Sequence, residues 1–317
     1  MSNKYSDKLL SVVLPCLNES ENINSTYETI SVILKDLGIN YEIIFVDNGG
    51  TDDQLDLMKI LYSKDPDHVK IISLSRNFGY QMSLSAGLEY SNGDAVILID
   101  ADLQDPPSMI KDFLDEWSKG YQVVYGVRKK RIGGHWFQRF FYKIFYRVFN
   151  ITSDVHIPHD AGEFGLMDRK VINHIKSMPE RVRFIRGLRA WVGYKSKGIE
   201  YTRLDREKGS SFATSLNWAP FALDGILSFT TKILSYAFLF SMVIFMLALA
   251  FIFYTIWWYF EYKDGLMAGI SSLLVLTAFF NGIIIFMLGL VGAFVERIFL
   301  EVKERPRFIV QETIGLK

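Results

Sequence analysis

The chain has 317 residues and is 50% hydrophobic, which suffices for one or two domains with a full core. Its 35 basic and 35 acidic residues give a formal net charge of zero, which argues against a general nucleic-acid binder, because such a protein needs a basic excess to replace counterions. The single cysteine, Cys16, excludes an internal disulfide bond and a cysteine-based metal site.

The first 100 residues alternate between two sequence patterns. Short apolar runs rich in β-branched residues predict buried strands over 9–14, 41–46, 69–73 and 95–99. Apolar residues at helical spacing predict helices over 20–36, from about 52 to 63, and from Gly79 through Tyr90. Strands that alternate with helices predict an α/β domain, with a parallel sheet and helices on both faces.

Polar residues follow three of these strands, and the carboxyl edge of an open α/β sheet is where ligands bind. They are Asp47 after the second strand, Arg76 and Asn77 after the third, and the segment Asp-Ala-Asp-Leu-Gln-Asp at 100–105 after the fourth. Two carboxylates one residue apart offer hard oxygen ligands to a divalent cation that carries a diphosphate. No G-x-G-x-x-G follows the first strand and no P-loop sequence occurs, so neither a dinucleotide cofactor nor a P-loop is supported.

A further strand is predicted over 123–126, and a basic run that includes Arg128 and Arg131 follows it. These arginines either lie in a solvated loop or bind a diphosphate through bidentate contacts. Residues 136–149 then place aromatic side chains on one helical face and basic side chains on another. This pattern predicts an interfacial helix on a membrane surface, with a helix packed on the sheet as the alternative. Residues 216–229 are a second candidate interfacial helix.

Two long segments, Ile233–Phe260 and Gly265–Val295, contain no charged residue. A membrane core of about 30 Å needs roughly 20 helical residues, so two transmembrane helices are predicted at about 233–260 and 266–295, joined as a hairpin. Basic residues flank the outer ends of the pair, whereas the loop at 261–264 has one lysine against two acids. The positive-inside rule therefore predicts that both ends are cytoplasmic.

These patterns divide the chain into four parts. They are a cytoplasmic domain over 1–210, an interfacial linker over 211–232, the transmembrane hairpin over 233–295 and a cytoplasmic tail over 296–317. The tail from residue 306 onward could pair with a neighbouring copy, and glycines at 282, 289 and 292 could allow close helix contact, so a homo-oligomer is left open.

Six motifs occur in order ahead of the predicted hairpin. They are Val13-Leu14-Pro15-x-x-Asn18-Glu19, Val46-Asp47, Ser75-Arg76-Asn77-Phe78-Gly79, the segment from Asp100 to Pro107, Asp160-x-Gly162-x-Phe164, and Arg206-x-x-Gly209-x-Ser211. With these motifs the chain resembles the family-2 glycosyltransferases of GT-A fold, specifically the polyprenyl-phosphate glycosyltransferases. This group includes dolichyl-phosphate mannose synthase and bactoprenyl glucosyltransferases of the GtrB type. The likeness covers almost the full length, including both predicted spans.

The chain departs from the family pattern in two motifs. The usual Asp-Asp-Gly-Ser is Asp-Asn-Gly-Gly at 47–50, and the usual Arg-Asp-x-Gly-Asp-Phe is His-Asp-Ala-Gly-Glu-Phe at 159–164. These departures leave the acidic segment at 100–105 intact. They weaken any choice of sugar that rests on the usual motifs.

The resemblance implies a role for each motif. Nucleotide-sugar binding is implied for Pro15, Leu17, Glu19, Asp47, Asn77, Asp100 and Arg131. A Mg²⁺ or Mn²⁺ site is implied at Asp100, Asp102 and Gln104. Catalytic roles are implied for Asp102, Asp160, Arg128 and Arg206, with the arginines neutralising phosphates and Asp160 orienting the sugar or an arginine.

The implied activity is transfer of a sugar, with inversion, from a nucleotide sugar to polyprenyl (undecaprenyl) phosphate at the cytoplasmic side of the cell membrane. UDP-glucose is the favoured donor, and UDP-GlcNAc, GDP-mannose and a UDP-aminosugar remain open. A processive polysaccharide synthase is disfavoured, because it needs more spans and a Gln-x-x-Arg-Trp motif that this chain lacks. A non-catalytic, membrane-anchored nucleotide-sugar binder remains the second hypothesis.

Overall fold

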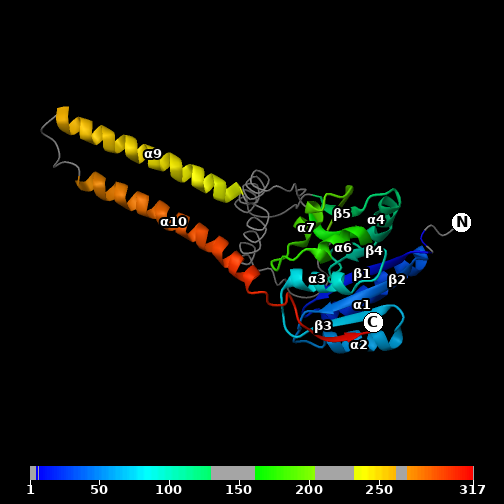
Figure 1. The fold of residues 1–317 in the computed structure, drawn as a ribbon. Coiled ribbons are helices and arrows are strands. Elements are labelled where there is room, and N and C mark those ends of the chain that lie inside the picture. Colours follow the sequence, from blue (N-terminus) through cyan, green and yellow to red (C-terminus); the bar gives the residue numbers. More distant parts are fainter. Residues whose placement is uncertain (1–4, 6, 130–160, 204–231, 262–269, 317) are drawn as a thin grey trace.

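The computed structural model describes residues 5, 7–129, 161–203, 232–261 and 270–316. The candidate interfacial helices at 136–149 and 216–229 lie outside these residues, as do the site candidates Arg131, Asp160 and Arg206. The described part forms a sheet with helices on both faces, from which two long helices project (Figure 1).

Every element predicted in the first 100 residues is present. The strands are β1 (Leu9–Cys16), β2 (Asn40–Asp47), β3 (Val69–Leu74) and β4 (Ala95–Leu98). The helices between them are α1 (Ser20–Leu37), α2 (Gln54–Lys64) and α3 (Tyr80–Tyr90). The strand predicted over 123–126 is also confirmed, as β5 (Val123–Arg128).

The sheet is mixed, with the strand order β7-β5-β6-β4-β1-β2-β3-β8. Strands β1 to β4 pair in parallel, as predicted. The prediction of a parallel sheet is wrong beyond them, because β6 (Ala161–Asp168) runs antiparallel between β4 and β5, and β8 (Val310–Ile314) runs antiparallel to β3. The parallel prediction rested on strands that alternate with single helices, and in the sequence β6 does not follow β4 in that way, nor does β8 follow β3. Strand β7 (Ser196–Tyr201) completes the sheet in parallel with β5.

The central strands are buried on both faces, and alternate residues face opposite layers. In β1, Leu14 packs in the core that contains α1 and α2, whereas Val13 packs in the core that contains α3. In β2, Phe45 and Ile44 divide in the same way. The remaining helices are α4 (Met109–Ser118) on the α1 side, and α6 (Arg169–Ser177) and α7 (Ile185–Trp191) on the α3 side.

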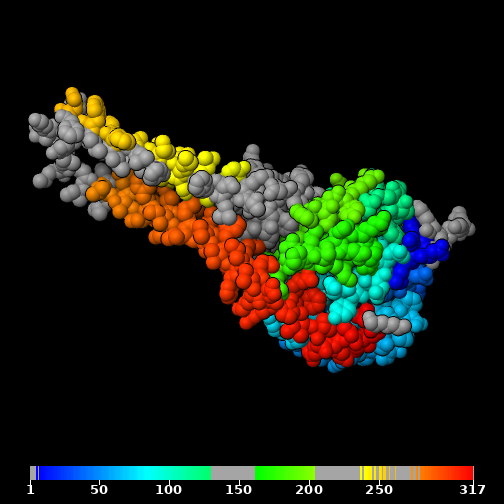
Figure 2. Space-filling view, in the orientation of Figure 1, coloured from blue at the N-terminus to red at the C-terminus, as the bar shows by residue number. Residues whose placement is uncertain are grey.

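Two long helices, α9 (Lys232–Glu261) and α10 (Ile270–Val302), run antiparallel and extend away from the sheet (Figures 1 and 2). Among the described residues, one stretch is long and apolar enough to cross a membrane: Phe279–Val302 of α10, with a mean hydropathy of 2.3 and none of its most apolar window buried. Helix α10 continues past the predicted end at Val295, through charged residues that are good helix formers.

The segment after α10 returns to the sheet of its own chain. Strand β8 pairs with β3, with Val310 opposite Leu74 and Ile314 opposite Ile71. Strand β8 is the outermost strand of the sheet, so this pairing uses one of its edges, and the suggested pairing of the tail with a neighbouring copy stays a prediction. Because Val310 lies at the carboxyl end of β3, the chain arrives from α10 at the carboxyl edge of the sheet.

Candidate active site

The ends of the four parallel strands bring distant parts of the sequence to one edge of the sheet. Cys16 lies opposite Asp47, Asp47 opposite Ser73, and Val13 opposite Leu98. The segments that follow these strands therefore leave the sheet together. The antiparallel β6 begins at the same edge, since Gly165 lies opposite Leu98.

The acidic segment at 100–105 forms a tight turn directly after β4. Leu103 adopts a left-handed backbone conformation with a φ of 54°, which is uncommon for a residue other than glycine. The Gln104 N–H donates a hydrogen bond to the Asp102 carboxylate at 3.1 Å, and the Thr26 hydroxyl donates to the Ala101 carbonyl at 2.7 Å. These bonds hold the turn so that Asp102 is buried while Asp100 and Gln104 remain partly exposed.

Asp100 is held between a hydroxyl and a guanidinium. The Tyr80 hydroxyl donates to Asp100 Oδ1 at 2.7 Å, and Arg203 Nη2 lies 3.9 Å from Asp100 Oδ2. Burial, together with the negative charge of Asp105, raises the pKa of Asp100 to about 6. The nearby positive charge therefore does not fully compensate the ionised form of Asp100 for its burial.

Asp105 lies beside two arginines at the other end of the turn. Its Oδ1 is 3.7 Å from Arg128 Nη2 and 3.5 Å from Arg203 Nε, and it accepts a hydrogen bond from the Tyr201 hydroxyl. The turn thus carries three carboxylates, Asp100, Asp102 and Asp105, and two guanidiniums contact it through Asp100 and Asp105. The excess negative charge favours a cation at the partly exposed end of the turn.

The donors of this turn fit a Mg²⁺ or Mn²⁺ ion that is held in part by a bound diphosphate. Asp100, Asp102 and Gln104 offer hard oxygen atoms from one turn. Within the described ranges, no three His, Cys, Asp or Glu side chains form a group that could hold a metal without other ligands. Mg²⁺ at nucleotide sites commonly takes one or two carboxylates and completes its shell with phosphate and water, so this set is of the expected kind.

Protein groups occupy most of the Asp47 carboxylate. It accepts hydrogen bonds from the Ser73 hydroxyl at 2.8 Å, from the Gly50 N–H at 3.0 Å and from the buried Gln54 amide. The Gln54 carbonyl in turn accepts from the Glu19 N–H at 3.0 Å. Through these hydrogen bonds, Asp47 connects the ends of β1, β2 and β3. A carboxylate has about four lone-pair positions, and three of them are used here, so little hydrogen-bonding capacity is left for a ligand.

The departure from Asp-Asp-Gly-Ser at 47–50 has a structural explanation. Asn48 accepts a hydrogen bond from the Phe78 N–H at 3.0 Å and donates one to Asn77 Oδ1 at 3.1 Å, whereas an aspartate could only accept. At Gly50, a Cβ atom would lie 2.4 Å from Gln54 Nε2. Gly50 therefore leaves the space that Gln54 uses to reach Asp47.

The structure gathers most of the predicted site residues at this edge and adds residues that the sequence analysis did not assign. The described candidates at the edge are Pro15, Leu17, Glu19, Asp47, Asn77, Asp100, Asp102, Gln104 and Arg128. The added residues are Gln54, Tyr80, Asp105, Tyr201 and Arg203. The sequence offers only weak signals for these residues. Tyr80 directly follows the motif at 75–79, and Arg203 lies three residues before Arg206 of another motif.

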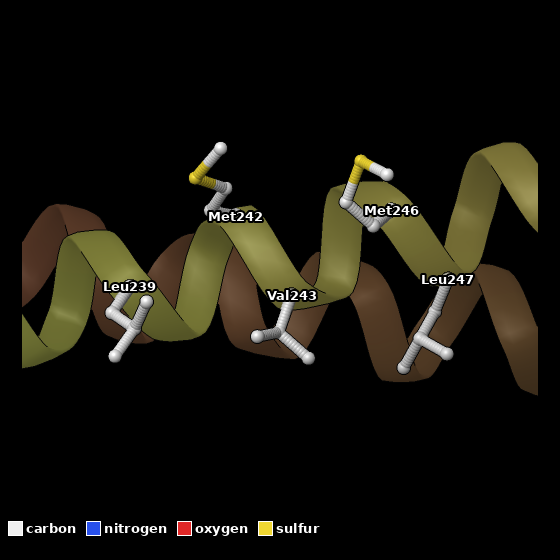
Figure 3. Close-up of a pocket in the computed structure, with 5 residues that line it drawn as sticks. All are labelled: Leu239, Met242, Val243, Met246 and Leu247. Carbon is white, nitrogen blue, oxygen red and sulfur yellow. The ribbon is translucent and has the colours of Figure 1, made fainter.

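A surface hollow on α9 lies apart from this site. Its lining is entirely apolar, and the side chains stand out from the helix (Figure 3). They belong to Leu239, Met242, Val243, Met246 and Leu247. None of these five side chains could hold a diphosphate.

Comparison with known proteins agrees with the motifs. Residues 11–176 match the model of glycosyl transferase family 2. An uncharacterized glycosyltransferase of Bacillus subtilis, YkcC, is 38% identical over 97% of this chain and 94% of its own length. An uncharacterized glycosyltransferase of Synechocystis, sll0501, is 39% identical over 97% of this chain and 96% of its own. A prophage-derived bactoprenol glucosyl transferase of Shigella flexneri is 33% identical over 96% of this chain and 98% of its own.

Among solved structures, a glucosyl-3-phosphoglycerate synthase from Mycobacterium tuberculosis covers 70% of this chain and 79% of its own, with a TM-score of 0.48 and 21% identity. The family match and the near full-length relatives identify the protein at the level of family. The chain belongs to glycosyltransferase family 2.

Proposed function

We propose that the protein transfers a sugar from a nucleotide sugar to a polyprenyl phosphate, with inversion, at the cytoplasmic face of a cell membrane. UDP-glucose is the proposed donor. Full-length similarity to a bactoprenol glucosyl transferase supports both the lipid acceptor and glucose. The acidic turn beside two arginines supports a diphosphate leaving group, since it supplies oxygen ligands for a cation and guanidiniums for phosphate.

The observation that supports the lipid acceptor is the place where the chain joins the sheet after α10. It does so as β8, which begins at the carboxyl end of β3, and this is the edge of the sheet at which the acidic turn lies. A polyprenyl chain cannot leave the bilayer cheaply, because each buried CH₂ contributes about 0.8 kcal/mol. The site must therefore come to the headgroup level, and a membrane-held α10 would keep this edge there.

The proposed topology has both α9 and α10 crossing the membrane, with the sheet domain in the cytoplasm. Arg297, Lys303, Arg305 and Arg307 lie at the sheet end of α10, and the sequence between the two helices has little positive charge. This asymmetry follows the positive-inside rule. The same basic residues would attract the acceptor phosphate to the surface.

In the proposed mechanism, Asp100, Asp102 and Gln104 would hold Mg²⁺ or Mn²⁺. When bound, the ion supplies charge stabilisation to the departing diphosphate. Arg128, and outside the described residues Arg131 and Arg206, would neutralise phosphate oxygens of the donor or the acceptor. Pro15, Leu17 and Glu19 would line the nucleoside pocket.

The acceptor phosphate would attack the anomeric carbon from the face opposite the leaving group. A phosphate monoester has its second pKa at about 6, so it is largely dianionic at neutral pH and needs little help from a general base. Asp160 is therefore proposed to orient the sugar or an arginine rather than to remove a proton.

The proposal is tested with membranes that contain the protein, labelled nucleotide sugars, polyprenyl phosphate and Mg²⁺. We expect a lipid-linked sugar, formed fastest from UDP-glucose, and mass spectrometry of the lipid product identifies the sugar. If no tested donor gives a lipid-linked sugar, the transferase proposal fails and a non-catalytic nucleotide-sugar binder becomes the better description. A faster reaction with UDP-GlcNAc, GDP-mannose or a UDP-aminosugar would overturn only the choice of donor.

A further inference from the structure

Asp105 is the most deeply buried carboxylate of the acidic turn, with a residue exposure of 1%. At this exposure it cannot reach a substrate directly. Its neighbours are two arginines from different strands: Arg128 ends β5, and Arg203 lies just beyond β7. Because Asp100 is a proposed metal ligand, Asp105 is the carboxylate that remains available to hold both guanidiniums.

The hydroxyl of Tyr201 connects Arg128 to Asp105. Arg128 Nε donates to the Tyr201 hydroxyl at 3.0 Å, and that hydroxyl donates to Asp105. The direction is fixed, because a guanidinium can only donate and a carboxylate can only accept. The Tyr201 ring is itself held, since it packs edge-on against Phe164 at 5.6 Å and covers Gly126, where a Cβ atom would lie 2.7 Å from it.

Both arginines have donors that no described residue uses. Each guanidinium has five N–H groups, and Arg128 makes one hydrogen bond among the described residues, to Tyr201. Arg203 contacts Asp105 and Asp100 as ion pairs, and its buried Nε has no hydrogen-bond partner within the described part of the chain. The two side chains are 27% and 28% exposed, so part of each is accessible to a ligand. With a cation bound to Asp100 and Asp102, Asp105 would be the one carboxylate left to balance two guanidiniums, and the pair would keep positive charge for an anion.

We propose that Asp105 and Tyr201 are positioning residues that hold Arg128 and Arg203 side by side as a phosphate-binding pair. The pair binds either the diphosphate of the donor or the phosphomonoester of the lipid acceptor, both of which take planar, bidentate arginine contacts. The choice between these two sources rests on the proposed function. The claim that Asp105 and Tyr201 position the two arginines does not rest on sugar transfer, because it can be tested by phosphate binding alone.

The sharpest variant is Tyr201→Phe, which keeps the ring and its packing and removes only the hydroxyl. Its matched control is Tyr27→Phe, because the Tyr27 hydroxyl also donates to a carboxylate at 2.7 Å, but that carboxylate is Asp65, directly after α2, and not a residue of the acidic turn. Asp105→Asn is the second variant; it keeps the shape and an acceptor oxygen but removes the charge that holds both arginines.

Two measurements separate the two phosphate sources. Calorimetric titration of the full chain in detergent with UDP and Mg²⁺ reports the donor side without turnover, and the KM for polyprenyl phosphate at saturating donor reports the acceptor side. We expect Tyr201→Phe to weaken one of these by about tenfold, the size of one charge-assisted hydrogen bond. Asp105→Asn should weaken the same one further, and Tyr27→Phe should change neither. A change in UDP affinity assigns the pair to the donor, and a change in the KM for the lipid assigns it to the acceptor.

The inference is overturned if Tyr201→Phe and Asp105→Asn melt within a few degrees of the wild type and keep both constants. It is also overturned if all three variants lose affinity only in proportion to a lower melting temperature, since that marks a purely structural role. If the wild type binds UDP but makes no lipid-linked sugar, the proposed transfer fails, while weaker UDP binding by Tyr201→Phe still supports the positioning. A wild type that binds no phosphate compound overturns both.

Discussion

The backbone N–H of Ser75 donates a hydrogen bond to the carbonyl oxygen of Ile309 at 3.0 Å. This bond joins the end of β3, where the loop with Arg76 and Asn77 begins, to the segment that returns from α10. A second junction lies nearby in the chain, where Glu301 of α10 accepts from the Arg181 N–H at 2.9 Å. The last turn of α10 and the segment that follows it are thus each hydrogen-bonded to the sheet domain.

Strand β8 should therefore contribute to the stability of the sheet domain. Val310 packs against the core on the α3 side, whereas the next residue, Gln311, is exposed. Val310→Asp should lower the free energy of unfolding by about 1–3 kcal/mol, because it places a carboxylate against apolar side chains. Gln311→Asp introduces the same residue into the same strand and should cost only about 0.5 kcal/mol or less. Thermal unfolding of the detergent-solubilised chain compares the two; equal melting temperatures would mean that β8 is not packed on the sheet.

Removal of metal should stop the proposed reaction, and Asp102→Ala should reproduce that loss. We expect EDTA to abolish transfer and added Mg²⁺ or Mn²⁺ to restore it. Asp102→Ala should lower kcat on the order of 100-fold, since it removes a proposed ligand of the ion that stabilises the leaving diphosphate. Asp112, an exposed carboxylate on α4, provides the control, and Asp112→Ala should keep full activity. Full activity of Asp102→Ala would refute the proposed site.

Gly49 should be intolerant of any side chain for two separate reasons. Its φ is 69°, and a Cβ atom would lie 2.4 Å from the backbone carbonyl carbon of Arg76. Gly120 has a similar backbone constraint, with a φ of 90°, but nothing lies within 4 Å of its Cβ position. Gly120→Ala should cost about 1 kcal/mol from backbone strain alone. Gly49→Ala should cost more and should also weaken UDP binding, because it forces the loops at 48–50 and 76–77 apart. Calorimetry and thermal melts distinguish the two effects, and an unchanged UDP affinity would count against a nucleotide site there.

Asp94 should make a pH-dependent contribution to stability. It accepts a hydrogen bond from the Leu9 N–H at 3.0 Å and lies 3.3 Å from Lys8, and the backbone bond is the main cause that lowers its pKa below the ordinary value of 3.8. A carboxyl with a lowered folded-state pKa stabilises the fold above the unfolded-state pKa, and this stabilisation is lost as the pH falls through the folded-state value.

Asp94→Asn should therefore melt at a lower temperature than the wild type at pH 7, and the difference should shrink as the pH falls below 3.8. Tryptophan fluorescence melts across this range provide the measurement. A difference that stays constant down to the lowest pH at which the chain folds would show that the charge of Asp94 is not the cause.

The first four strands and three helices could be predicted because each rests on a local pattern. Buried strands such as 95–99 are continuous apolar runs, and α1 repeats its apolar residues at helical spacing, so neither depends on distant partners. The same holds for the motifs, since Asp100, Asp102 and Gln104 lie within one turn. Uncharged segments of the length of 233–260 and 265–295 likewise carry their signal in composition alone.

Only the tertiary structure shows which strands join the sheet after β5, and which charged side chains lie in contact with each other. Strands β7 and β8 read Ser-Lys-Gly-Ile-Glu-Tyr and Val-Gln-Glu-Thr-Ile, with little apolar pattern, because each lies at an edge and is partly exposed. Tyr201 and Asp105 are 96 residues apart in sequence, and neither carries a local signal of the other. Their contact exists because β5 and β7 pair in register at Arg128 and Tyr201 beside the acidic turn. Pairing between distant segments depends on the packing of the whole chain, and local sequence patterns do not encode it.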